Sequence, residues 1–396
     1  MKEFSLENGI RVVFYPHEGQ TTAVSVVVQT GSCNEGSKEH GVAHFIEHML
    51  FEGTKTRSAI EISSDVESKG GEIGAYTTYD RTCFYVKSLN KHLRESVDVL
   101  WDVLSNPVFS EKSIEKEREV ILSEISLRKD EPRYLQWDLL LGDLFKGYSL
   151  EHPIIGDRES VSNMTREMLV DFYERNYKGS NLLITVVGSE EGLEAVKEFG
   201  SFPAGEIPGC DSVEEVSNEQ RYVTVQRDIS QSYLLLGYRT VPLYHEDSEA
   251  LEVLRAILSR GMSGRLFDEI RNKRGLAYEV GAFHNPSTLY GFFVFSVCTQ
   301  KRHVPTCLDI IGTELWREIG NKELNDAKQF LEGEFIMENE DNQNLSENLG
   351  IWKQAGVVEN FPDYCRRIKA VGIDDLKRVI DRYFSDGFSR VLVEEG

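Results

Sequence analysis

The sequence lacks the features that mark several large protein classes. Basic residues are few, since 44 Lys and Arg face 66 Asp and Glu and give a formal net charge of −22. Nucleic acids and anionic membrane surfaces require a basic footprint, so we expect neither as a partner. Hydrophobic runs such as residues 23–28 are far too short to cross a bilayer. No glycine-rich loop follows a predicted strand, which argues against a nucleotide site.

The six cysteines are scattered and include no C-x-x-C pair. This usage is typical of small hydrophobic residues in a reducing compartment, and it excludes a disulfide framework or a zinc knuckle. Residues 1–17 alternate like a strand around Asn8-Gly9 and do not resemble a signal peptide. We therefore expect a soluble protein of the cytoplasm.

The chain of 396 residues is long enough for two domains. A linker is predicted at residues 203–220, where proline and glycine are frequent and an acidic polar stretch follows. The flanking segments, 1–202 and 221–396, each open with strand-like runs followed by a helix-like segment, which predicts a duplicated unit. Strands and helices are mixed without strict alternation. This pattern favours an α+β fold in which each domain is a mostly antiparallel sheet with helices packed on one face.

The most informative segment lies between Ser37, a predicted helix N-cap, and Gly53, a predicted helix stop. At helical spacing His44 and His48 lie one turn apart on the same face, as two imidazoles must to bind one metal ion. Glu47 lies beside them and could take a proton from a metal-bound water. The order is H-x-x-E-H, the inverse of the H-E-x-x-H zinc motif. Alternatively, these residues form only the solvated face of an amphipathic helix.

A second predicted helix is capped by Ser110 or Ser113. Isoleucines at offsets of seven and four mark its buried stripe, namely Ile114, Ile121 and Ile125. Glu117 and Glu124 fall on the same stripe. Carboxylates on a buried stripe need a partner, and a cation is a suitable one. The other interpretation is a wide solvated face on a Glu-rich helix.

Two histidines and one glutamate that leave a fourth position for water are typical of a catalytic zinc site and not of a structural one. The ion would lower the pKa of the water and polarise a carbonyl group. Glu47 would then carry the proton to a leaving amine, so the pattern favours hydrolysis of peptide bonds.

The motif and its spacing resemble the inverzincin peptidases, which include pitrilysin, insulysin and the mitochondrial processing peptidases. In this sequence Glu124 follows His48 by 76 residues, and Glu117 precedes Glu124 by seven. The resemblance implies one zinc ion per chain, bound by His44, His48 and Glu124. It also implies that Glu47 is the base and that Glu117 supports the site without binding the ion.

The resemblance extends through most of the chain, with further similar segments at residues 152–156 and 181–188. Residues 70–77 are similar to the family strand that pairs with substrate. The residues that this similarity assigns to substrate binding are Gly74, Ala75, Tyr76 and Thr77. Gly74 departs from the family, which usually has Asn before the Ala, so only backbone pairing is expected to survive there.

In the second half, residues 261–278 predict a helix ended by Gly275 and followed by a strand. Arg271 and Tyr278 have the spacing of a family pair that holds the substrate carbonyl, and a fixed cation and a phenol are suitable oxyanion donors. The competing interpretation is a helix-end arginine and a packed strand tyrosine. Residues 247–255 of this half contain no histidine, so we expect no zinc there.

These features predict a zinc metalloendopeptidase that cleaves extended peptides or unfolded segments. The chain is similar to the short bacterial-type branch of the family, in which two subunits form a clam-shell chamber. Relatives with four domains on one chain carry the zinc in the first domain and the Arg/Tyr pair in the fourth. We therefore expect a homodimer with sites shared between subunits. The alternative is a non-catalytic or partner-dependent subunit of a processing-peptidase-like assembly.

Overall fold

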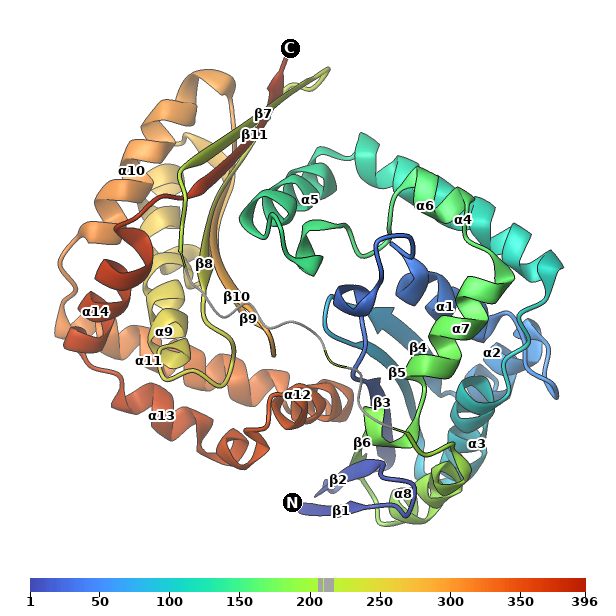
Figure 1. Ribbon diagram of the computed structural model, residues 1–396. Coiled ribbons are helices and arrows are strands. Elements are labelled where there is room, and N and C mark those ends of the chain that lie inside the picture. Colours follow the sequence, from blue (N-terminus) through green and yellow to red (C-terminus); the bar gives the residue numbers. More distant parts are fainter. Residues whose placement is uncertain (206–208, 210–216) are drawn as a thin grey trace. The chain divides into compact units, whose positions relative to one another are not determined.

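The computed structural model describes residues 1–205, 209 and 217–396 (Figure 1). Most of the predicted linker, 203–220, lies outside the described residues. The chain forms two compact units. Unit 1 comprises Met1–Leu127, His152–Asp211 and Glu338–Val358, and unit 2 comprises Arg128–Glu151, Ser212–Met337 and Glu359–Gly396. The units therefore differ from the predicted contiguous segments 1–202 and 221–396. Residues 128–151 of the first half belong to unit 2, and residues 338–358 of the second half belong to unit 1.

Unit 1 is built on a six-stranded sheet with the order β1-β2-β6-β3-β5-β4. The strands are β1 (Lys2–Ser5), β2 (Arg11–Pro16), β3 (Thr21–Val28), β4 (Glu72–Thr77), β5 (Thr82–Leu89) and β6 (Leu182–Gly188). Only β2 and β6 run parallel, and all other neighbours are antiparallel. Strand β3, in the middle of the sheet, is rich in valine and buried along nearly its whole length, as expected for a strand covered on both faces.

Most helices of unit 1 share one core with this sheet. They are α1 (Val42–Phe51), α2 (Ala59–Glu67), α3 (Leu93–Ser105), α4 (Glu111–Asp130), α6 (Arg158–Ser162), α7 (Arg166–Asn176) and α8 (Glu191–Ala195). Helix α1 packs against β4 and β5, so the predicted motif lies beneath one edge of the sheet.

Unit 2 is built on a five-stranded sheet with the order β7-β11-β8-β10-β9. The strands are β7 (Arg221–Arg227), β8 (Ser232–Thr240), β9 (Ala277–Pro286), β10 (Gly291–Thr299) and β11 (Ser389–Glu395). The helices that share its main core are α9 (Ser248–Ser259), α10 (Val304–Trp316), α11 (Asn321–Glu338), α13 (Tyr364–Ala370) and α14 (Ile373–Phe384).

The two sheets have the same topology apart from β1. In each, the first two strands in spatial order, β2-β6 or β7-β11, run parallel, and the next three pairings are antiparallel. Each sheet also ends on an edge strand that lies beside a helix, β4 beside α1 and β9 beside α9. This agreement confirms the α+β class and supports a duplicated unit.

One feature of the predicted fold needs correction, because each sheet also carries a helix on its second face. In unit 1 this helix is α12 (Asn342–Gln354), which crosses β3 and β6, and in unit 2 it is α5 (Pro132–Leu144), which crosses β8 and β11. Glycines allow the close approach. A Cβ atom at Gly350 would lie 3.0 Å from Val27, and one at Gly237 would lie 2.8 Å from Leu140. These two helices account for the exchange of segments between the halves of the sequence.

The described residues include no helix that has both the length and the apolar character needed to span a bilayer.

Candidate metal centre

The motif helix α1 begins at a left-handed glycine. Gly41 is the N-cap with a φ of +91°, and a Cβ atom there would lie 2.7 Å from the backbone oxygen of Ile155. Both the backbone angle and the close approach therefore favour glycine. The predicted cap, Ser37, lies before the helix, so the prediction placed the start too early. The predicted stop was nearly right, because α1 ends at Phe51, shortly before Gly53.

A glutamate replaces the serine as the capping group of α1. The carboxylate of Glu35 accepts hydrogen bonds from the backbone N–H groups of Gly41 (2.8 Å) and Ala43 (2.9 Å). Burial raises the pKa of Glu35 well above its ordinary value, although these hydrogen bonds oppose the shift. Glu35 could not be predicted as the capping residue, because it lies outside the usual N-cap position and only the turn before α1 brings it there.

The two histidines lie on the open side of α1. The opposite side is fully buried and consists of Phe45, Ile46, Met49 and Leu50. The ring centroids of His44 and His48 are 4.7 Å apart, and their side chains are 14% and 23% exposed. The helix therefore places two neighbouring imidazoles on one face, as the spacing predicts, and neither is freely solvated.

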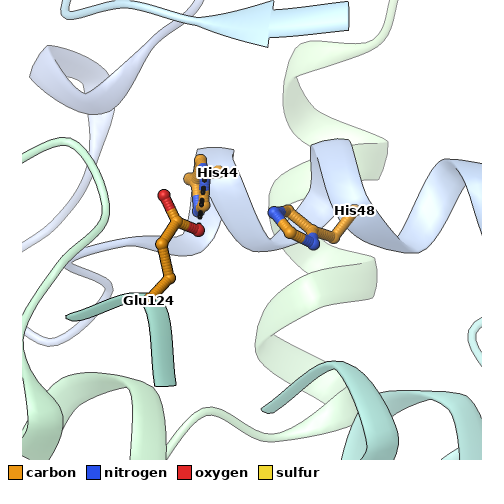
Figure 2. A group of neighbouring side chains, drawn as sticks. All are labelled: His44, His48 and Glu124. Carbon is orange, nitrogen blue, oxygen red and sulfur yellow. Dashed lines mark ion pairs between the residues drawn. The ribbon is translucent and has the colours of Figure 1, made fainter. Parts of the chain in front are cut away.

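Helix α4 brings a carboxylate to these histidines. It starts after Ser110, whose hydroxyl accepts a hydrogen bond from the backbone N–H of Ser113 at 3.1 Å. The predicted stripe of Ile114, Ile121 and Ile125 is buried. Glu124 directly precedes Ile125, the last residue of this stripe. Its Oε2 lies 3.9 Å from His44 Nε2 (Figure 2). Two helices far apart in sequence thus converge at the predicted position.

The donor set fits a zinc ion. One ligand atom from each of His44, His48 and Glu124 lies within 4.8 Å of the other two. Atoms bound about 2 Å from one ion lie at most about 4 Å apart, so small side-chain rotations would suffice. Two imidazole nitrogens and a carboxylate oxygen also leave a fourth position open, as catalytic zinc sites do. In the described part of the chain, no other set of three His, Cys, Asp or Glu side chains meets this spacing.

Glu117 fixes the orientation of one imidazole. Its Oε2 lies 2.9 Å from His48 Nδ1, and its side chain is only 9% exposed. An ionised carboxylate can only accept, so Nδ1 carries the hydrogen and Nε2 is left with a lone pair for a metal ion. This burial contradicts a freely solvated face for Glu117, which was the other interpretation of the sequence.

Glu47 is a partly buried carboxylate beside these groups. Its Oε2 accepts a hydrogen bond from the hydroxyl of Thr77, at 2.5 Å. Burial raises the pKa of Glu47, the hydrogen bond from Thr77 and the charge of His48 oppose the shift, and the charge of Glu124 adds to it. A carboxylate with a raised pKa is a stronger base than an exposed one. Thr77 was predicted only as a substrate-binding residue, and its contact with Glu47 joins two elements that are separate in the sequence.

Two family models together match most of the chain. The model described as Insulinase (Peptidase family M16) matches residues 11–158, and the model described as Peptidase M16 inactive domain matches residues 163–331. The chain belongs to peptidase family M16. This confirms the predicted pitrilysin-like family in its two-domain bacterial form.

Relatives of the M16 chain over its whole length are named zinc proteases. An uncharacterized zinc protease of Mycobacterium tuberculosis is 33% identical and covers 98% of this chain and 92% of its own. One from Rickettsia felis is 30% identical over 96% and 94% of the two chains. A crystal structure of a protease from Helicobacter pylori, 24% identical, covers 99% of both chains with a TM-score of 0.93, which shows a shared fold.

The predicted substrate strand of the M16 chain is an edge strand. β4 ends the sheet and pairs with β5, with Gly74 opposite Tyr85 and Thr77 opposite Thr82. A Cβ atom at Gly74 would lie 2.7 Å from the hydroxyl oxygen of Tyr85. The phenol of Tyr85 therefore occupies the space that a side chain at position 74 would need.

The predicted Arg/Tyr pair lies together in unit 2. Arg271 belongs to η7 (Phe267–Asn272), a π-helical turn, and the chain reverses at Gly275, with a φ of +61°, before β9. The Arg271 guanidinium donates to the backbone oxygen of Tyr278 at 2.8 Å and lies 4.5 Å from the centre of its ring. The Tyr278 side chain is not packed as the competing interpretation required, because the residue is 74% exposed.

Unit 2 contains an internal cation on α9, the helix beside its edge strand β9. In α9, the Arg255 guanidinium donates to Glu252 at 2.6 Å and also to Glu334 of α11. His284 of the edge strand β9 contacts Glu252 at 3.1 Å through Nδ1. In the described part of unit 2, no three His, Cys, Asp or Glu side chains lie close enough together to hold a metal ion. The contact of Arg255 with Glu334 joins two separate helices and could not be predicted from the spacing within either one.

Proposed function

We propose that this M16 chain is a zinc-dependent endopeptidase that cleaves extended peptides or unfolded segments. The observation that carries the proposal is the convergence of His44, His48 and Glu124 beside the partly buried carboxylate of Glu47. When bound there, zinc would polarise a carbonyl group and lower the pKa of water. Relatives of this chain are named zinc proteases, which supports zinc as the metal.

In this proposal Glu47 is the general base. Its Oε2 is occupied by Thr77, whereas Oε1 accepts no hydrogen bond from the described residues and is available to take a proton from the attacking water. The resulting carboxylic acid can then donate that proton to the leaving amine. Glu117 keeps the ring of His48 in the orientation and tautomer that metal binding requires.

The edge of β4 is the proposed binding site for substrate. An extended peptide would add a strand beside Gly74–Thr77, and its affinity would come mainly from backbone hydrogen bonds. Such pairing tolerates many side chains, so sequence selectivity should be modest. Arg271 and Tyr278 would hold the substrate carbonyl as a cation and a phenol.

We further propose a homodimer in the cytoplasm, in which the Arg/Tyr pair of each subunit completes the other subunit's site inside a shared chamber. The resemblance to four-domain relatives supports the sharing. The described cysteines Cys83, Cys298, Cys307 and Cys365 are free thiols, which supports a reducing compartment.

The decisive experiment is metal analysis combined with hydrolysis of a quenched peptide library by the purified chain alone. The parental chain should contain about one zinc and cleave peptides. Glu47→Gln should retain the zinc and lose most turnover, because an amide keeps the shape of the side chain but cannot accept the proton. Peptide hydrolysis at the parental rate by Glu47→Gln would remove Glu47 from its role as base. A parental chain that binds zinc but cleaves nothing would favour a non-catalytic or partner-dependent subunit.

Mixed dimers test whether sites are shared. The variants Glu47→Gln and Tyr278→Phe are each expected to be inactive and are co-expressed so that subunits pair at random. If sites are shared, half the dimers contain one intact site, and about a quarter of parental activity should return. If mixed dimers form but activity stays at the level of the separate variants, Tyr278 acts within its own chain.

A further inference from the structure

The proposed base is held by one residue of the edge strand. The hydroxyl of Thr77 donates to Glu47 Oε2 at 2.5 Å, and no other described side chain hydrogen-bonds to this carboxylate. A hydroxyl that faces an ionised carboxylate must donate, and such charge-assisted bonds are roughly twice as strong as neutral ones. The orientation of Glu47 on α1 therefore depends on a contact from β4.

Thr77 is itself fixed by its surroundings. It pairs in register with Thr82 of β5, at the closed end of the β4–β5 hairpin. The turn is closed by a hydrogen bond from the backbone N–H of Thr78 to the backbone oxygen of Arg81, at 2.8 Å. The backbone oxygen of Thr78 accepts in turn from Ser32 N–H at 3.2 Å. A β-branched side chain on such a backbone has few rotamers, so its hydroxyl is aimed at Glu47 at little entropic cost.

We propose that Thr77 is a positioning residue for the general base. By occupying Oε2 it leaves Oε1 as the oxygen that takes the proton from water. Thr77 also ends the segment Gly74–Thr77, which is the proposed docking edge for substrate, so one residue connects substrate pairing to base orientation. The kinetic consequence rests on the proposed function, whereas the hydrogen bond can be tested without it.

Two variants of Thr77 and one control variant test the kinetic consequence. Thr77→Val keeps the shape of the side chain and removes the donor, so kcat should fall about 10–100-fold, the range seen when a supporting hydrogen bond around a metal site is lost. KM and zinc content should stay close to parental values, because backbone pairing and the metal ligands are untouched. Thr77→Ser restores the donor and should recover most of kcat. Parental kcat in Thr77→Val, or a Thr77→Ser variant as slow as Thr77→Val, would overturn the proposal.

Thr82→Val is the matched control. Thr82 is the cross-strand neighbour of Thr77 and is buried, but its hydroxyl donates to the backbone oxygen of Thr30 and not to Glu47. This variant should be less stable than the parent and keep its kcat. An equal fall of kcat in Thr82→Val would show that the hairpin as a whole, and not the Thr77 hydroxyl, matters.

Thermal unfolding of the metal-free protein provides a readout independent of activity. Thr77→Val should lower the melting temperature in the parental background and lower it by a clearly smaller amount in a Glu47→Ala background, where the acceptor is gone. Equal losses in both backgrounds would mean that the two side chains are not coupled and would refute the inference. If the parental chain hydrolysed no peptide, the proposed function would fail. The melting temperatures of these variants would still show whether the side chains of Thr77 and Glu47 interact.

Discussion

Replacing Glu117 by glutamine should weaken zinc binding without removing a ligand. The substitution preserves the size of a side chain that is only 9% exposed, but it removes the negative charge 2.9 Å from His48 Nδ1. An amide can also present its NH₂ group to the ring, which would favour the tautomer with no lone pair on Nε2. We expect the dissociation constant for zinc to rise about 10–100-fold. This corresponds to about 1.4–2.7 kcal/mol of binding free energy.

The assay is a competition titration of the metal-free protein against a zinc-chelating dye at fixed pH. Glu115→Gln is the matched control, since Glu115 lies on the same helix, is 66% exposed and pairs with Arg118 instead of a histidine. Its zinc affinity should equal that of the parent. In excess zinc, the stabilisation gained on metal binding should shrink by the same 1.4–2.7 kcal/mol in Glu117→Gln, because ligand binding and stability are linked. Equal zinc affinities for Glu117→Gln and Glu115→Gln would refute the role of Glu117 in orienting His48.

Three further predictions concern the metal, the second unit and the edge strand. Removal of metal by a chelator should lower the melting temperature, and added zinc should restore it, whereas an unchanged melting curve would count against a preformed site. Arg255→Met should destabilise the protein by about 3–5 kcal/mol in urea unfolding, because it leaves the mostly buried carboxylate of Glu252 without its cation, and a parental midpoint would contradict this. Burial opposes ionisation of Glu252, but the hydrogen bond from His284 and the charge of Arg255 outweigh it and lower its pKa. At pH values above the ordinary pKa of a carboxyl group, ionised Glu252 therefore stabilises the fold. This stabilisation should be lost as the pH falls through the lowered pKa. Gly74→Asn should cost about 1–3 kcal/mol by crowding the phenol of Tyr85, and the cost should shrink in a Tyr85→Ala background if this crowding is its cause.

The candidate metal ligands could be predicted in part, because the arrangement within each helix is local. Helical periodicity alone places His44 beside His48, and the isoleucine stripe of α4 turns Glu117 and Glu124 toward the same side. The distance between the two helices did not follow from periodicity. It was supplied by the resemblance to a family in which such helices meet, and the structure brings the ligand atoms within 4.8 Å.

The start of α1 could not be predicted from standard cap residues. Ser37 has the right chemistry, but the chain turns at Gly41, where the backbone angle and the contact with Ile155 leave no room for a side chain. The capping carboxylate comes from Glu35 instead. The path of the preceding loop determines which residue caps the helix, and that path depends on packing against residues far away in the sequence.

The sequence by itself determined the α+β class, the repeated pattern of the two halves and the position of His44 and His48 on one helix face, because each of these depends on the spacing of neighbouring residues. The strand at residues 70–77 and the pairing of Glu124 with the two histidines were expected only from the resemblance to a family. The tertiary structure alone decided which helix covers the second face of each sheet, so that α5 and α12 join the sheet made by the other half of the chain. It also decided that Thr77 holds Glu47 and that Arg255 lies between two carboxylates. These pairings join separate elements, and periodicity within one element carries no information about the partner against which it will pack.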